Sequence, residues 1–318
     1  MKKCFMSSVI MIALIGSMAP SYAASDWETC IMSDKMDQAF PACQREAEQG
    51  NIDAQLILGN MYLSGQGVKQ DDRKAVEWLT KAAEQGNASA QWQLGSMYYF
   101  GTGVRQDYKK AYEWATKAAE QGDAGAQEML GIMYYSGRVV RQDYKKAVEW
   151  YTKAAEQGKK FAQSQLGGMY HDGQGVRQDY KKAVEWFTKA AEQGNADAQW
   201  KLGLMYLNGR GVRQDYKKAF EWTTKAVEQG NADAQVILGI MYHDGQGVRR
   251  DYKKAVEWLT KAAEQGNGKA QGFLGVMYNK GQGVRQNRAK AKEYFGLACD
   301  NGLQLGCDYY RKMNEGRY

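Results

Sequence analysis

The chain has two histidines, His171 and His243, the side chains best suited to hold a metal or move a proton near neutral pH. They occupy equivalent positions of a sequence repeat and lie two repeats apart. Packed neighbouring helices are about 8 to 10 Å apart, whereas the ligands of one zinc ion lie about 2 Å from it. A shared zinc site is therefore not expected, and polar residues that face solvent or a ligand are the simpler interpretation.

A Gly-x-Gly motif recurs along the chain, for example at Gly101 and Gly103. Glycine loops that bind phosphate follow a strand and open a helix. Here the motif separates two helical patterns, so we interpret it as a turn. The sequence thus predicts no catalytic residue, no cofactor and no metal, and we expect a protein that is not an enzyme.

The elements that position these residues belong to a repeat of 36 residues. The tripeptide Glu-Gln-Gly recurs at this spacing from Glu48 to Glu264 without insertion, and a fixed period of this length marks a repeat array. In the copy at 84–119, apolar residues at helical spacing predict an A helix over 88–100. A B helix is predicted to begin after Asp107, a capping residue, and to end at Gly122.

We therefore predict an all-α fold, an α/α solenoid (superhelix) of helix-turn-helix repeats with partial helical caps. One hairpin of this size cannot bury its own apolar face, but stacked hairpins supply one continuous core. The predicted divisions are a signal peptide at 1–23, an N-terminal cap at 24–47 with a helix over 35–49, seven repeats at 48–83, 84–119, 120–155, 156–191, 192–227, 228–263 and 264–299, and a C-terminal capping helix at 300–318.

The repeat reads A-x-A-Q-x-x-L-G-x-M-Y-x-x-G-x-G-V, then D-Y-x-K-A-x-E-W-x-x-K-A-A-E-Q-G, and it strongly resembles the Sel1-like repeat. The resemblance implies a solenoid related to tetratricopeptide arrays and a role as an adaptor or partner-binding surface. In cysteine-rich relatives it also implies an alternative, the binding or hydrolysis of cell-wall or β-lactam material. The Ser-x-x-Lys motif of that serine chemistry is absent from the sequence. The third repeat departs from the pattern at Gly137 to Val140, losing the second loop glycine, so its turn is expected to differ.

The first residues indicate export. Lys2 and Lys3 precede a short apolar segment and a small-residue exit at Ala23, which is typical of a secretory signal peptide; an uncleaved anchor is the alternative. The apolar segment is too short to span a bilayer, so we expect a periplasmic or secreted protein with no stable membrane insertion after cleavage. The net charge of +7 is interleaved rather than clustered, which argues against a nucleic-acid partner.

Four cysteines follow the signal peptide: Cys30, Cys43, Cys299 and Cys307. An even number in an exported protein favours disulfides. Three pairings are possible, of which local pairing at each end is the simplest, and free thiols are the alternative. The Cys299 and Cys307 spacing also resembles the bridge of cysteine-rich secreted Sel1-like members, which supports local pairing.

A comparison of the copies separates packing from candidate function. Positions equivalent to Ala90, Leu94 and Gly95 scarcely change, whereas those equivalent to 92, 96, 99 and 100 vary and share one helical face. We expect this variable face to be free of the packing constraint, and the resemblance places it on the concave surface. It is predicted to bind a protein or peptide, in envelope processes or host interaction; drift without function is the alternative. The candidate binding residues are Trp92, Ser96, Tyr99, Phe100, Tyr135, His171, Trp200 and His243.

Overall fold

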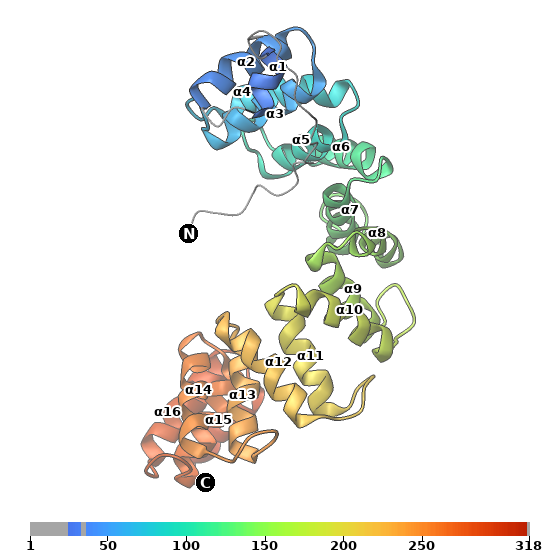
Figure 1. Cartoon of the computed structure of the whole chain (residues 1–318). Helices are drawn as coiled ribbons and strands as arrows, with labels where there is room; N and C mark the ends of the chain where they lie inside the picture. Colours follow the sequence, from blue (N-terminus) through green and yellow to red (C-terminus); the bar gives the residue numbers. More distant parts are fainter. Residues whose placement is uncertain (1–24, 33–35, 317–318) are drawn as a thin grey trace, which may run out of the picture. The chain divides into compact units, whose positions relative to one another are not determined.

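The computed structural model describes residues 25–32 and 36–316, which form 17 helices and no strand. They fall into two compact units, one with α1 to α4 (residues up to 85) and one with α5 to α17 (residues from 86) (Figure 1). The predicted all-α repeat fold is confirmed. The predicted signal peptide at 1–23 lies outside the described residues. Within the described part, no helix has both the length and the apolar character needed to cross a bilayer.

Each repeat contributes one A helix and one B helix, each of 13 residues. The A helices are α3 (Ile52–Ser64), α5 (Ala88–Phe100), α7 (Ala124–Ser136), α9 (Lys160–Asp172), α11 (Ala196–Asn208), α13 (Ala232–Asp244) and α15 (Gly268–Lys280). The B helices are α4 (Asp72–Glu84), α6 (Tyr108–Glu120), α8 (Tyr144–Glu156), α10 (Tyr180–Glu192), α12 (Tyr216–Glu228), α14 (Tyr252–Glu264) and α16 (Arg288–Asp300).

The helix ends form at the predicted residues. The Asn87 side chain accepts a hydrogen bond from Ala90 N at 2.9 Å, and Asp107 accepts one from Lys110 N at 3.0 Å. Gly101 ends α5 with a φ of 76°, a left-handed conformation that glycine adopts without steric cost. Caps satisfy backbone groups that a helix leaves unpaired at its ends.

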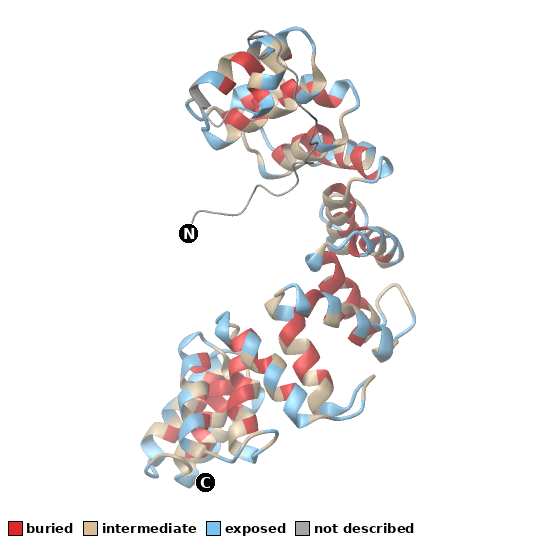
Figure 2. Cartoon of the chain, in the orientation of Figure 1, coloured by how far each residue is buried: buried red, intermediate tan, exposed pale blue. Residues whose placement is uncertain are grey.

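The glycine in the middle of each A helix lets the B helix of the same repeat pack closely. A Cβ at Gly167 would lie 2.7 Å from Phe187 Cδ1, and a Cβ at Gly131 would lie 2.5 Å from Tyr151 Cδ1. The aromatic rings therefore occupy the space that a side chain on the A helix would take. Figure 2 shows buried residues concentrated where paired helices face each other. This contact explains why the glycine recurs in every copy.

A buried glutamine joins consecutive repeats. Gln163 on α9 donates to Ala155 O at the end of the preceding B helix at 3.0 Å, and it accepts from Gln193 Nε2 at the end of its own B helix at 2.8 Å. Equivalent amide pairs occur in all seven repeats: Gln85 to Gln55, Gln121 to Gln91, Gln157 to Gln127, Gln193 to Gln163, Gln229 to Gln199, Gln265 to Gln235 and Asn301 to Gln271. The glutamine of Glu-Gln-Gly is therefore a structural residue.

The turn of the third repeat differs, as predicted. In the fourth repeat Gln174 N donates to Met169 O at 3.0 Å, whereas in the third repeat Arg138 N donates to Ser136 Oγ at 3.5 Å. A Cβ on the second loop glycine of the fourth repeat, Gly175, would lie 2.3 Å from a backbone oxygen of the preceding repeat. The valine at the equivalent position of the third repeat therefore cannot follow the same backbone path.

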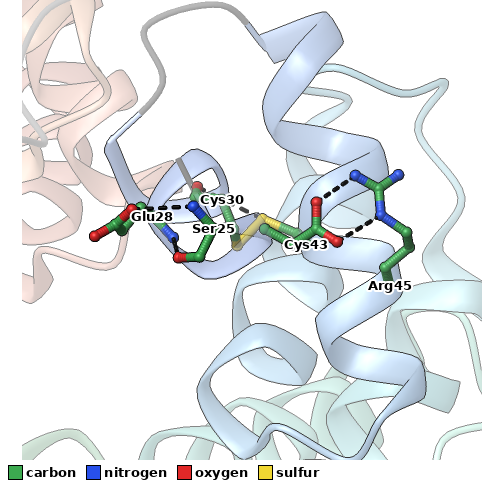
Figure 3. Close-up of polar contacts among 6 residues, drawn as sticks. Ser25, Glu28, Cys30, Cys43 and Arg45 are labelled. Carbon is green, nitrogen blue, oxygen red and sulfur yellow. Dashed lines mark hydrogen bonds and ion pairs between the residues drawn. A yellow bond between two sulfur atoms is a disulfide. The ribbon is translucent and has the colours of Figure 1, made fainter. Parts of the chain in front are cut away.

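The N-terminal cap consists of α1 (Asp26–Met32) and α2 (Met36–Glu48). The helix predicted over 35–49 is confirmed as α2, while α1 lies in a segment where no helix was predicted. The Cys30–Cys43 disulfide joins the two helices, and the Arg45 guanidinium forms a two-bond ion pair with Asp26 (Figure 3). The short helix is thus held by a covalent bond and an ion pair.

The C-terminal cap is α17 (Gln304–Asn314), which follows the last B helix. The Cys299–Cys307 disulfide ties it to α16. The cysteines therefore pair locally at each end, as predicted, and the second bridge fixes the helix that covers the last repeat.

Candidate binding surface on the A helices

The A helices form the inner layer of the unit from 86 to 318. Successive A helices contact one another from α5 through α7, α9 and α11 to α13, whereas successive B helices make fewer contacts with each other. Closer approach on the A side curves this stack towards the A helices. The A-helix side chains that point away from the B helices therefore line a concave surface within this unit, which we call the A face.

Seven of the eight candidate binding residues are half-buried on this surface, and the eighth, Phe100, is 70% exposed. The position of Ser96 is half-buried in every repeat, and its residues are Asn60, Ser96, Ile132, Gly168, Leu204, Ile240 and Val276. Variable side chains thus remain accessible to a partner on the A face.

The position of Trp92 has a packing role that the sequence did not indicate. A Cβ at Gly125 on α7 would lie 2.7 Å from Trp92 Cε2, so the indole covers the next A helix. The equivalent residues Ser164 and Val236 are only 3% and 4% exposed. Trp200, also at this position, packs against the apolar cluster around Leu238. The expectation that the whole variable face is free of packing is therefore wrong at this position.

Glu128, again at the position of Trp92, caps a helix of the next repeat. Six A helices are preceded by Asn or Asp, but α9 is preceded by Lys159, which makes no side-chain cap. Glu128 Oε2 accepts the hydrogen bond from Ala162 N at 3.1 Å, the amide that the missing cap would bind. Burial raises the pKa of Glu128, while the bond from Ala162 and the nearby Lys159 act in the opposite direction.

The position of Tyr99 contacts its own B helix. Tyr99, Tyr135, His171 and His243 pack their rings on the first tyrosine of that helix, with centroids 5.4, 5.4, 5.2 and 5.0 Å apart. The same position also reaches the next repeat.

Tyr135 Oη donates to Gln174 Oε1 at 3.3 Å, and His243 Nε2 lies 3.3 Å from Gln282 Oε1. In these two repeats the position therefore connects an A helix, α7 or α13, to the loop of the following repeat.

The two histidines share one arrangement and do not converge. His171 Nδ1 lies 2.7 Å from Asp172 Oδ1, and His243 Nδ1 lies 2.6 Å from Asp244 Oδ1. They are carried by α9 and α13, with α11 between them. Each is a local His-Asp pair on the A face.

A cavity between α9 and α11 brings two candidate residues together. It measures about 230 Å³, and its lining includes His171, Trp200, Gly168, Lys201 and Arg210. The last three were not among the predicted site residues. Gly168 and Lys201 had a signal in the sequence, since each differs from every other copy at its position, whereas Arg210 had none, because Arg138 occupies the same position of the third repeat.

A second hollow on the A face is apolar. It measures about 380 Å³ and lies across α13, α15 and α17, where Ile240, Phe273, Val276 and Leu305 line it. Lys269 lies at this site as well. The same repeated surface therefore offers charged chemistry at α9 and α11 and apolar chemistry at α13 to α17.

Stacked helical hairpins with an inner layer of A helices define an α/α solenoid. The family model described as Sel1 repeat matches residues 52–87, 88–123, 124–159, 160–195, 196–231, 232–267 and 268–303. The chain therefore belongs to the Sel1 repeat family, whose members are generally protein-interaction scaffolds and typically non-catalytic. Each matched repeat begins four residues after the predicted unit, as at 52 rather than 48.

Two solved structures show the similarity in detail. A protective antigen present in uropathogenic Escherichia coli strains, which displays an SLR fold, is 37% identical with a TM-score of 0.80, over 90% of this chain and 62% of that one. A Sel1 repeat protein from Oxalobacter formigenes is 36% identical with a TM-score of 0.64, over 91% of this chain and 84% of that one. A comparison with curated proteins found no match.

Proposed function

We propose that this protein is an exported scaffold that binds another protein through the A face of residues 86–318, without catalysing a reaction. The observation that carries the proposal is the presence of two hollows of different chemistry on one repeated surface. Packing alone would favour the same side chains in every repeat. Different chemistry at equivalent positions suits recognition of one extended partner.

Photo-crosslinking in the cells that produce the protein tests the choice of surface. A photoreactive residue replaces Ser96 or Val276 on the A face, and the control replaces Glu185, an exposed residue of the B helix α10. A defined adduct from the A-face positions and none from Glu185 would support the proposal. Equal labelling from Glu185, or no adduct from either A-face position, would overturn it.

Export is the second part of the proposal. It is supported by the predicted signal peptide and by two disulfides, which persist mainly in oxidising compartments. The mature protein should be recovered from the envelope or the medium, and N-terminal sequencing should begin at Ala24. A protein that retains Met1 and stays in the cytosol with free thiols would refute this part.

A further inference from the structure

The cavity between α9 and α11 exists because Gly168 replaces a larger side chain. The equivalent residues of the neighbouring repeats, Ile132 and Leu204, are half-buried. A Cβ on Gly168 would have Lys201 Nζ at 3.8 Å as its nearest neighbour from outside its own segment of the helix. Phe187 and Met205 also line the cavity, and they are 1% and 2% exposed. The missing side chain thus opens a space against an apolar core.

Two cations, Lys201 and Arg210, line this space. Lys201 Nζ lies 5.5 Å from the centroid of the Phe187 ring, and the Arg210 guanidinium lies 5.9 Å from that of Tyr180. Among the described residues, neither cation forms an ion pair with a carboxylate. Asp172 also lines the cavity, but its carboxylate is bonded to His171. The cavity therefore combines an apolar base with two cations available for a carboxylate.

This combination occurs once in the repeat array. The position of Lys201 holds Ile57, Gln93, Met129, Gln165, Ile237 and Phe273 in the other repeats. The position of Arg210 holds a neutral residue in every other repeat except the third. The glycine and the two cations therefore meet only between the fourth and fifth repeats.

We infer that this cavity binds an acidic side chain of the partner protein, together with an apolar residue next to it in the partner sequence. The carboxylate would pair with Lys201 and Arg210, since hydrogen bonds between charged groups are stronger than neutral ones. The apolar neighbour would cover Trp200 and the base of the cavity. Leu204 and Asn208 also line the cavity, which gives a peptide contacts that a free carboxylate would lack. This inference rests on the proposed function.

The test uses variants taken from the chain's own repeats. Gly168→Ile fills the cavity with the residue present at 132 and 240, and Lys201→Gln removes the charge with the residue present at 93 and 165. Asn60→Ile is the matched control, because it places the same side chain at the equivalent position on α3, which lies outside residues 86–318. All three should unfold at the same temperature as the unmodified chain within a few degrees.

Random twelve-residue peptides are displayed and selected on the mature chain, and the affinity of enriched peptides is measured by calorimetry. Enriched sequences should carry Asp or Glu beside an apolar residue. Gly168→Ile and Lys201→Gln should each weaken them about tenfold or more, corresponding to about 1.4 kcal/mol, whereas Asn60→Ile should not. Free glutamate should compete only weakly; competition equal to that of the peptide would overturn the choice of a peptide ligand.

The remaining outcomes separate this inference from the proposed function. Peptides that bind the A face equally well in Gly168→Ile would overturn the pocket and leave the scaffold proposal standing. Peptides that require the cavity but carry no acidic residue would overturn the assigned chemistry. Failure of all A-face crosslinking would refute the proposed function, and the pocket inference with it.

Discussion

Thr223 offers the sharpest test of the packing between A and B helices. It is fully buried on α12, and its Oγ1 has no hydrogen-bond partner among the described residues. A Cβ on Gly203 would lie 2.5 Å from this oxygen, so the hydroxyl sits directly against α11. The other repeats place Leu, Ala, Tyr or Phe at this position. Thr223 therefore puts an unsatisfied polar group where the array otherwise packs a side chain against glycine.

Thr223→Val should stabilise the protein. A buried polar group without a partner costs about 1 to 3 kcal/mol, and valine keeps the branched shape while removing that cost. Because the methyl group is larger than the hydroxyl and the contact with α11 is close, we expect a net gain of about 1 kcal/mol. This corresponds to a rise in melting temperature of about 1.5 °C for a chain of this size.

Thr224→Val is the matched control on the same helix. Thr224 Oγ1 donates to Phe220 O at 2.8 Å, so its loss should leave stability unchanged or slightly lower. Urea unfolding followed by circular dichroism measures both variants, and a constant slope would show that the unfolded states are comparable. A Thr223→Val variant that is no more stable than Thr224→Val would refute the argument that the hydroxyl is unsatisfied.

Three further predictions concern the joints between elements. Gln163→Leu leaves Ala155 O on α8 and Gln193 Nε2 at the end of α10 without their hydrogen-bond partner. It should lower the free energy of unfolding in urea by about 1 to 3 kcal/mol, and an unchanged midpoint would contradict its bridging role. Burial raises the pKa of Glu128, so the folded chain binds the proton of this carboxyl group more tightly than the unfolded chain does. The resulting contribution to the free energy of unfolding is present below the ordinary glutamate pKa of 4.5 and is lost as pH rises through the raised pKa. Glu128→Gln, which keeps an acceptor for Ala162, should flatten that dependence in unfolding measured from pH 4 to 8, and a profile as steep as before would count against it. Replacing Cys299 and Cys307 with serine should cost about 2 kcal/mol locally and accelerate hydrogen exchange in α17 but not in α9; equal protection of α17 would show that the bridge is dispensable.

The regular parts of the fold were predictable because each repeats a local rule. The caps at Asn87 and Asp107, the glycine that ends α5 and the local cysteine pairing all depend on residues close in sequence. The period then identifies the partner of every helix. By contrast, α1 is a short helix held by a disulfide and an ion pair, and neither the period nor its own sequence marks it.

The candidate site was only partly predictable, because its chemistry arises between repeats. Trp92 and Glu128 share one variable position, yet one covers the next A helix and the other caps it. The cavity depends on Gly168, Lys201 and Arg210, which come from two repeats and are each unremarkable within their own copy. Only the register of neighbouring repeats in space brings such residues together.

The residues that depart from the repeat pattern therefore fall into two kinds. Some restore a contact that another departure has removed, and others leave space or charge that a ligand can use. Glu128 departs from its copies, but the departure restores a cap that Lys159 cannot provide, so the two changes offset each other within the fold. Gly168 and Lys201 also depart together, but the described contacts do not cancel them: Gly168 opens a space, and Lys201 lies over the Phe187 ring and forms no ion pair with a described carboxylate. Paired departures that cancel maintain the array, whereas paired departures that leave room and charge indicate a ligand. By this criterion the joint between α9 and α11 is the part of the A face where a partner is expected to make its most specific contact.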